Sequence, residues 1–405
     1  MANRYLWSSY VVEYARSLFD RERGLASSVT GGPVTLYGSC YALQVAQYLS
    51  QDFQYKTMCI EAIRSCQEPE TGLFRGPELT SWCPPEDALH DEEHLLYHLT
   101  CAVLPVLQDS GVEPQYPIRA AHAFCDRDYL KKWLEQIDWK DAWFEGNNLL
   151  FVGQLLLFLR DHEQQDGAAA SLEYWFDWLD HEIDPATGLW GTNGFCGIPA
   201  AVYGGYHQLL MYYHEKRPIQ YPAELVDAVL SLQHPDGGFR PGGGGGACED
   251  VDAVDILVNV YKRHDVRRPA IRAALRRCVR HILAAQNPDG GFSYARGKPY
   301  IHMGIPSTAN EVGQSGAFPT WFRVHTLALI AQVLPNEPAL RGIPFSFSRH
   351  LSMGWHDTDV VCPTYGVAGR MSELGHTAWW GAKIQRHHGR QFVRRVRKRL
   401  GRQSG

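Results

Sequence analysis

The stretch Gln233-His-Pro-Asp-Gly-Gly-Phe239 occurs a second time, almost letter for letter, as Gln286-Asn-Pro-Asp-Gly-Gly-Phe292. The two phenylalanines lie 53 positions apart, and a fixed period of this size is typical of repeated supersecondary units. Pro-Asp-Gly-Gly is turn chemistry, because proline presets one dihedral angle and glycine accepts a positive φ. Apolar stretches flank each copy, so the repeat predicts a helix, a turn that carries an aromatic residue, and a second helix.

Looser copies of this turn extend the series in both directions. Glu70-Thr-Gly-Leu-Phe74 and Asp184-Pro-Ala-Thr-Gly-Leu-Trp190 keep the glycine and the aromatic residue, and weaker candidates place Trp139 and Trp355 at the same point. Successive aromatic residues are then 49 to 65 positions apart, which is room for two helices of ordinary length with their loops. We therefore expect an all-α fold, an (α/α)6 toroid in which about six helical hairpins close into a ring.

Composition is compatible with one continuous domain over residues 1–384. The chain has 405 residues, of which 45% are hydrophobic and 20% charged, and a net charge of −5 that gives no general attraction to nucleic acid. The ten cysteines are scattered without Cys-x-x-Cys pairs, as in a protein with reduced thiols. The N-terminus lacks the apolar run of a signal peptide, and nowhere do 18 apolar residues follow one another. These features predict a cytoplasmic protein.

The stretch 385–405 departs from this even charge distribution. It is rich in arginine and contains no acidic residue, and Phe392, Val396 and Leu400 recur every four positions. One interpretation is a solvated terminus. The other is a basic amphipathic segment that makes peripheral contact with the anionic inner face of a membrane.

Acidic residues gather after the glycine run 242–246. Glu249 and Asp250 stand where a helix would begin, and capping explains acids at that position without catalysis. Asp252, Asp255 and Asn259 share one face of the same helix, and their neighbours are almost all apolar. Such a helix is expected to be buried with its polar stripe toward an internal cavity. There a carboxylic acid would stay protonated and could act as a general acid; the alternative is a capped helix with a solvated acidic edge.

The Gln-x-x-x-Gly-Gly-aromatic repeats resemble the QW-type motifs of the terpenoid cyclase and protein prenyltransferase superfamily, squalene-hopene cyclases included. The resemblance covers roughly residues 35–380 and implies an α/α toroid. The stretch Asp250-Val-Asp252-Ala253 is similar to the Asp-x-Asp-Asp motif of class II cyclases, with Ala253 in place of the last aspartate. The resemblance implies proton-initiated cyclisation of an isoprenoid substrate, with Asp252 as the acid and Asp250 and Asp255 tuning its protonation.

A cyclase of this kind needs aromatic faces that stabilise carbocations. Candidates for substrate contact lie near the expected starts of inner helices or on the acidic helix: Trp143, Phe144, Phe195, Tyr203, His207, Asn259, Trp321 and Phe322. For each aromatic residue, packing between repeats is the alternative. No metal is required on this account, although Mg²⁺ would accompany a diphosphate substrate.

Three other functions stay open. Helical rings with acidic, aromatic-lined centres also serve sugar-processing enzymes, and Asp91 with Asp252 could then be the acid and base. The prenyltransferase branch of the superfamily holds zinc, for which the resemblance suggests Cys248, Asp250 and either His302 or His325. A third alternative is a catalytically silent ring that binds a lipid or a protein partner.

Overall fold

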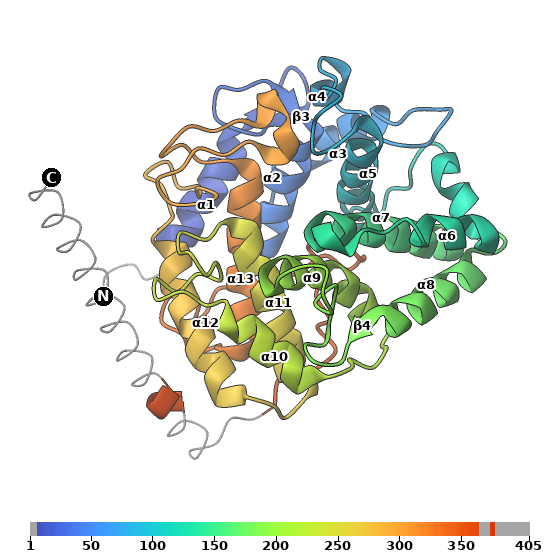
Figure 1. The fold of residues 1–405 in the computed structure, drawn as a ribbon. Coiled ribbons are helices and arrows are strands. Elements are labelled where there is room, and N and C mark those ends of the chain that lie inside the picture. Colours follow the sequence, from blue (N-terminus) through green and yellow to red (C-terminus); the bar gives the residue numbers. More distant parts are fainter. Residues whose placement is uncertain (1–5, 364–372, 377–405) are drawn as a thin grey trace, which may run out of the picture.

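The inner layer of the fold is a closed ring of helices, as the computed structural model shows for residues 6–363 and 373–376. Each inner helix packs against the next one along the chain, and the last packs against the first (Figure 1). Within the described residues these helices are α2 (Leu36–Tyr48), α5 (Glu92–Asp109), α7 (Ala142–Asp161), α9 (Ile198–His214), α11 (Ala247–Arg263) and α13 (Ala317–Val333). The predicted all-α toroid is confirmed.

Each inner helix is paired with a helix that precedes it in the chain and lies outside this ring (Figure 1). The outer helices are α1 (Leu6–Ser17), α3 (Lys56–Ser65), α6 (Arg127–Leu134), α8 (Ala168–Glu182), α10 (Pro222–Ser231) and α12 (Arg268–Leu283). Their sequences explain the position: α12 buries Ile271, Leu275 and Ile282 on one stripe and carries arginines on the other. In contrast, α13 is buried around almost its whole circumference, as expected for a helix between two layers.

Minor elements connect the helices. The short helices are α4 (Pro77–Thr80) and the 3-10 turns η1 (Arg119–Cys125), η2 (Trp139–Asp141), η3 (His302–Gly304) and η4 (Pro306–Thr308). The strands β1 (Phe19–Asp20), β2 (Leu25–Ser27) and β3 (Val34–Thr35) form one small antiparallel sheet, and β4 (Ile183–Asp184) pairs with β5 (Leu189–Trp190). Both sheets lie in turns that lead from an outer helix to an inner one.

The inner helices are parallel, with their N-termini at one end of the ring. Contacts between consecutive N-terminal turns establish this: the His94 Nδ1 of α5 lies 2.8 Å from the Asn148 Oδ1 of α7, and the Tyr203 hydroxyl of α9 donates to the Phe239 carbonyl before α11 at 2.8 Å. We call this end the mouth of the ring and the opposite end its base.

In the two repeats with the sequence Gln-x-Pro-Asp-Gly-Gly-Phe, the glutamine connects one hairpin to the next. The Gln233 Nε2 donates to the Gly237 carbonyl of its own turn and to the Ala274 carbonyl of α12, both at 2.9 Å. Gln286 repeats the pattern with the carbonyls of Gly290 and Trp7, at 2.9 and 3.0 Å. Because Trp7 belongs to α1, this second glutamine connects the last repeat to the first and closes the outer layer.

The expected turn at Trp355 is wrong. Residues 345–357 follow α13 and fill the base of the ring, where the Tyr48 and Tyr206 hydroxyls donate to the carbonyls of Gly354 and Met353 at 2.6 and 2.9 Å. The missing hairpin is the first one, α1 and α2, whose turn at 20–26 lacks an aromatic residue. There the Ala26 amide donates to the Ser39 Oγ of α2 at 2.8 Å, a bond that an aromatic residue's amide makes elsewhere.

None of the helices in the described part of the chain is long and apolar enough to cross a membrane. The basic stretch 385–405 lies outside the described residues, so its proposed membrane contact stays a prediction.

Candidate functional site

The acidic stretch begins α11 at the mouth of the ring. Gly246 caps the helix, and its amide donates to the Glu249 Oε2 at 2.9 Å. The Tyr294 hydroxyl donates to the same oxygen at 2.9 Å. Glu249 is therefore a capping residue, in agreement with the structural interpretation of its position.

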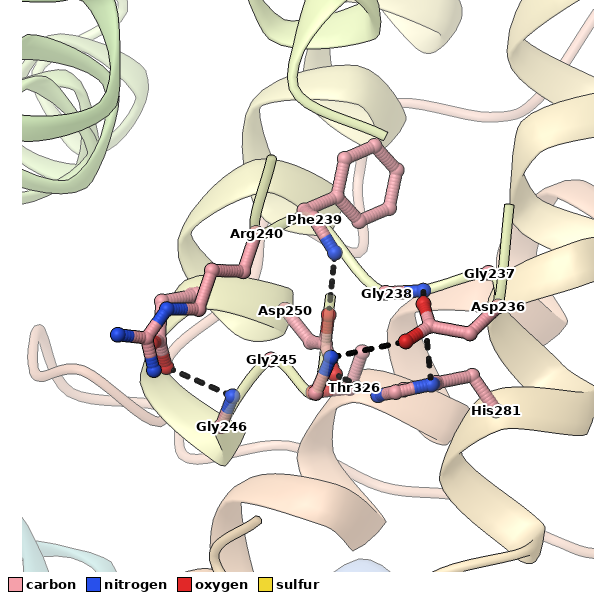
Figure 2. A network of polar contacts seen from close by, with 12 residues as sticks. Asp236, Gly237, Gly238, Phe239, Arg240, Gly245, Gly246, Asp250, His281 and Thr326 are labelled. Carbon is pink, nitrogen blue, oxygen red and sulfur yellow. Dashed lines mark hydrogen bonds and ion pairs between the residues drawn. The ribbon is translucent and has the colours of Figure 1, made fainter. Parts of the chain in front are cut away.

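Asp250 is fully buried in a network of polar contacts (Figure 2). Its Oδ1 accepts the Phe239 amide at 2.8 Å, and its Oδ2 forms an ion pair with Arg323 and lies 3.3 Å from the His281 Nε2. Burial alone would raise the pKa of this carboxyl, but Arg323 and His281 outweigh it and hold the pKa below its usual value. Asp250 is therefore ionised and held in place.

The same position in other repeats is occupied by threonine. The Phe292 amide donates to the Thr320 Oγ1 of α13 at 2.9 Å, and the Phe74 amide donates to the Thr100 Oγ1 of α5 at 3.0 Å. Asp250 thus anchors the aromatic turn to the inner helix, as its counterparts do. Its extra charge is matched by Arg323, whose Nη2 also donates to the Tyr294 carbonyl at 2.7 Å.

The surroundings of Asp252 change its pKa in the opposite direction. Its side chain is 1% exposed, and its Oδ2 has no hydrogen-bond partner among the described residues. Burial raises the pKa of this carboxyl well above its usual value, and the neighbouring carboxylates of Glu249, Asp255 and Asp250 raise it further. These surroundings favour the protonated, neutral form of Asp252 over the carboxylate.

Asp255 follows one turn later on the same face of α11. Its Oδ1 accepts the Asn259 Nδ2 at 3.0 Å, while its Oδ2 is buried without a partner in the described part of the chain. Burial raises the pKa of Asp255 to about 7, despite the opposing hydrogen bond from Asn259. The Asn259 Oδ1 in turn accepts Arg263 at 2.6 Å. The two carboxyls share one face and differ in how readily they ionise.

Inward-facing side chains of the other helices surround these acids. Burial raises the pKa of Tyr206, and the charges of Asp255 and Asp252 raise it further. The pKa of Tyr213 is raised in the same way by burial and then by Asp255. Several buried polar atoms on these inner helices have no partner among the described residues: those of Gln208, Tyr213, Trp321 and His325. Buried polar groups are normally hydrogen-bonded, so these unpartnered atoms are unusual for a protein interior.

Five of the predicted contact residues lie on the inner helices α7, α9 and α13. Tyr203 packs on Trp143, with ring centroids 4.9 Å apart, and its pKa is raised by burial and then by Glu249 and Asp252. Trp321 stacks on Tyr41 at 4.6 Å, and Phe322 packs beside it at 4.5 Å. His207 is buried against Tyr206, and burial lowers its pKa to about 4.

Two predicted contact residues lie elsewhere. Phe195 is 53% exposed. The amides of Phe195 and Cys196 both donate to the Gly191 carbonyl, so the turn at 191–196 folds on itself and leaves the phenyl ring of Phe195 on the outside. A place for Phe195 in a closed cavity is therefore not supported. Phe144 stacks on His94 at 4.7 Å and lines a separate cleft between α5, α6 and α7.

Sequence reasoning missed Arg323 and Tyr213. Arg323 is the only charged residue in the apolar helix Ala317–Val333, and that pattern alone indicates a buried ion pair. Tyr213 offered no such signal, because it is one of 20 tyrosines in the chain.

The residues of the alternative sites do not gather in this way. Asp91 is exposed and caps α5 by accepting the His94 amide at 2.8 Å, whereas Asp252 is buried on α11. For zinc, Asp250 is already paired with Arg323, and the described residues contain no group of three metal-ligating side chains. Neither set forms a site in the described structure.

A family model described as the prenyltransferase alpha-alpha toroid domain matches residues 9–149 and 149–305. The drimenyl diphosphate synthase of Streptantibioticus cattleyicolor is 39% identical over 149 residues, which are 36% of this chain and only 26% of that protein. A possible member of the GH105 family from Klebsiella pneumoniae superposes with a TM-score of 0.40 at 13% identity, over 81% of this chain and 92% of that one.

Proposed function

The chain belongs to the prenyltransferase α/α-toroid family, and from this premise we propose that it cyclises an isoprenoid substrate by proton donation from Asp252. The observation that carries the proposal is the buried Asp252, whose pKa is raised well above its usual value and whose Oδ2 has no partner among the described residues. The similarity of part of the chain to a drimenyl diphosphate synthase supports an isoprenoid as the substrate class.

The first step would be transfer of the Asp252 proton to a terminal carbon–carbon double bond. The proton forms a new C–H bond with the alkene electrons, which leaves a carbocation on the substrate and a carboxylate on Asp252. The electron pair of a second double bond then closes a ring. Loss of a proton from the final cation gives a cyclic isomer of unchanged mass, and solvent returns a proton to Asp252.

The surrounding residues fit the charges of these steps. Asp250 stays ionised beside Arg323, and its negative charge helps to keep Asp252 protonated between turnovers. The rings of Tyr206 and Trp321 are buried and offer faces that stabilise a cation by about 0.5 to 2 kcal/mol each. Mg²⁺ enters the proposal only as the counter-ion of a diphosphate substrate.

The test is incubation of the purified protein with prenyl diphosphates of several lengths and with squalene, with and without Mg²⁺, followed by mass spectrometry. We expect a cyclic isomer, and in D₂O this product should carry one deuterium at the protonated carbon. Asp252→Asn should lower the rate at least about 100-fold, because the variant has no acidic proton, and should leave the unfolding free energy within about 1 kcal/mol.

Asp227→Asn is the matched control, since Asp227 lies on α10 with its side chain 53% exposed and should have no effect on turnover. Retained activity in Asp252→Asn would remove this residue from the mechanism. Binding of a substrate without any product would favour a silent ring, and an absence of both would move the search to oligosaccharides.

A further inference from the structure

A cleft lies between α5, α6 and α7, whereas Asp252 lies on α11. Its volume is about 360 Å³, which is within the range of small-molecule sites. The proposed cyclisation uses none of its polar groups. The ligand of this cleft must therefore follow from the chemistry of its own lining residues.

Carboxylates dominate the polar lining of the cleft. Asp91 and Glu93 are exposed at the start of α5, and Glu145 is partly buried in the first turn of α7. Burial raises the pKa of Glu145, and the nearby Asp141 and Asp138 add to it against the hydrogen bonds from Asn148 and the Asp138 amide. Among the described side chains that line the cleft, none is lysine or arginine. The carboxylates among the lining residues therefore have no lysine or arginine beside them in the lining.

A buried histidine contributes an unused acceptor to the same cleft. His94 is 5% exposed, and its Nδ1 lies 2.8 Å from the Asn148 Oδ1, so we assign the proton to Nδ1. Its Nε2 is then a lone-pair acceptor, and this atom has no partner among the described residues. Burial and the neighbouring His90 lower the pKa of His94 to about 4, so the imidazole is neutral at pH 7 and adds no positive charge.

Aromatic rings form the remaining walls. Phe144 stacks on His94 with centroids 4.7 Å apart, and Trp133, Tyr97 and Tyr129 also line the cleft. The faces of such rings attract cations and exclude anions. Carboxylates at the rim, aromatic walls and one neutral acceptor within are complementary to a cation that also has a hydrogen-bond donor.

We propose that this cleft binds a small organic ammonium ion with a hydroxyl or N–H donor, with the ammonium near Glu145 and the aromatic faces and the donor on the His94 Nε2. The same charges disfavour a diphosphate, so the cleft is separate from the site of the proposed cyclisation. Its occupancy does not depend on whether that reaction occurs.

The probe is choline, compared with 3,3-dimethylbutan-1-ol, which has the same shape and hydroxyl but no charge. Binding is measured by ligand-observed NMR titration with the full-length protein. Choline should bind at least tenfold more tightly than the alcohol. Glu145→Gln should weaken choline at least fivefold and the alcohol much less, because it removes the charge on the wall and only one of the two hydrogen bonds that the carboxylate accepts.

Glu61→Gln serves as the matched control, since Glu61 is exposed on α3 and does not line the cleft; it should leave choline affinity unchanged. Thermal unfolding of each variant verifies that it is folded. Equal affinity for choline and the alcohol would overturn the proposal, as would choline binding that is insensitive to Glu145→Gln. Tighter binding of methyl glucoside than of choline would also overturn it and identify a sugar cleft.

Discussion

Three aspartates of one helix have three different protonation behaviours because their surroundings differ. Asp250 is buried, yet Arg323 and His281 lower its pKa. Asp252 is buried beside other carboxylates without a cation in contact, and its pKa is raised well above the usual value. Asp255 receives one hydrogen bond and has a pKa of about 7. The different protonation of the three aspartates is therefore a product of local contacts and not of residue type.

The raised pKa of Asp255 predicts a pH-dependent stability. In the unfolded chain its pKa would be about 3.9, so between pH 4 and pH 7 the folded protein holds a proton that the unfolded chain has lost. The free energy of unfolding therefore falls as the pH rises through this range and stays reduced above it. Asparagine does not titrate, so Asp255→Asn should stabilise the protein relative to wild type by on the order of 2 kcal/mol more at pH 8 than at pH 5.

Chemical denaturation at the two pH values measures this difference. Asp227→Asn, at an exposed site, should give the same small change at both. A stability gap between wild type and Asp255→Asn that does not grow with pH would show that Asp255 titrates normally in the folded state.

At the scale of the element, the repeated unit is a turn held by three kinds of contact. A glutamine bonds to the turn and to the next outer helix, the aromatic amide bonds to the following inner helix, and a glycine lets the turn approach its neighbour. Gly237 has a φ of 103°, and a Cβ there would lie 2.5 Å from the Arg277 carbonyl oxygen of α12. Gly290 repeats this against the Tyr10 carbonyl of α1, at 2.3 Å. The contact between Gly290 and Tyr10 explains why the turn of the last repeat can pack closely against α1.

Gly237→Ala should therefore destabilise the protein by at least about 2 kcal/mol, because alanine is strained at this φ and its methyl group would collide with α12. Gly242→Ala is the control in the same loop, since a Cβ there meets no atom within 4 Å, and its unfolding midpoint should be unchanged or slightly raised. Equal midpoints for the two variants, measured by thermal unfolding, would contradict the close approach.

At the scale of the whole molecule, closure distinguishes this ring from an open array of repeats. α13 packs on α2, and Trp7 of α1 joins the ends: its Nε1 donates to the Ala339 carbonyl at 2.9 Å and its ring contacts Phe292 and Phe345. An open array has two ends at which unfolding can begin. A closed ring has neither, so we expect one cooperative transition.

Trp7→Ala tests closure. The residue is 8% exposed, and loss of a buried tryptophan typically costs about 3 to 5 kcal/mol. Calorimetry should show a single transition in wild type and a lower Tm in the variant. Tyr10→Ala, on the same helix but with its side chain 52% exposed, should lower the Tm much less. Separate transitions in the wild type would show that the hairpins unfold independently.

The turn motifs made much of the fold predictable. Gln-x-Pro-Asp-Gly-Gly-Phe encodes its contacts locally, since the turn geometry and the glutamine bond form within a few residues. Trp139 and Trp190 also precede inner helices, α7 and α9, as their spacing predicted. The first hairpin was missed because Ala26 stands where other repeats have an aromatic residue. Trp355 gave a wrong prediction because an aromatic residue after a glycine also occurs in the segment 345–357, which fills the base of the ring.

The sequence by itself determined the class of fold, five of the hairpins and the helix on which the acids lie, because these follow from periodicity and turn chemistry along the chain. Only the tertiary structure decided the state of each acid and the surroundings of each aromatic residue. Arg323 forms an ion pair with Asp250, 73 positions away in the sequence. Phe144 stacks on His94 of α5 and not on the helix that carries Asp252. Ion pairs, desolvation and stacking depend on which helices the ring brings together, and that information is not local to any stretch of the chain.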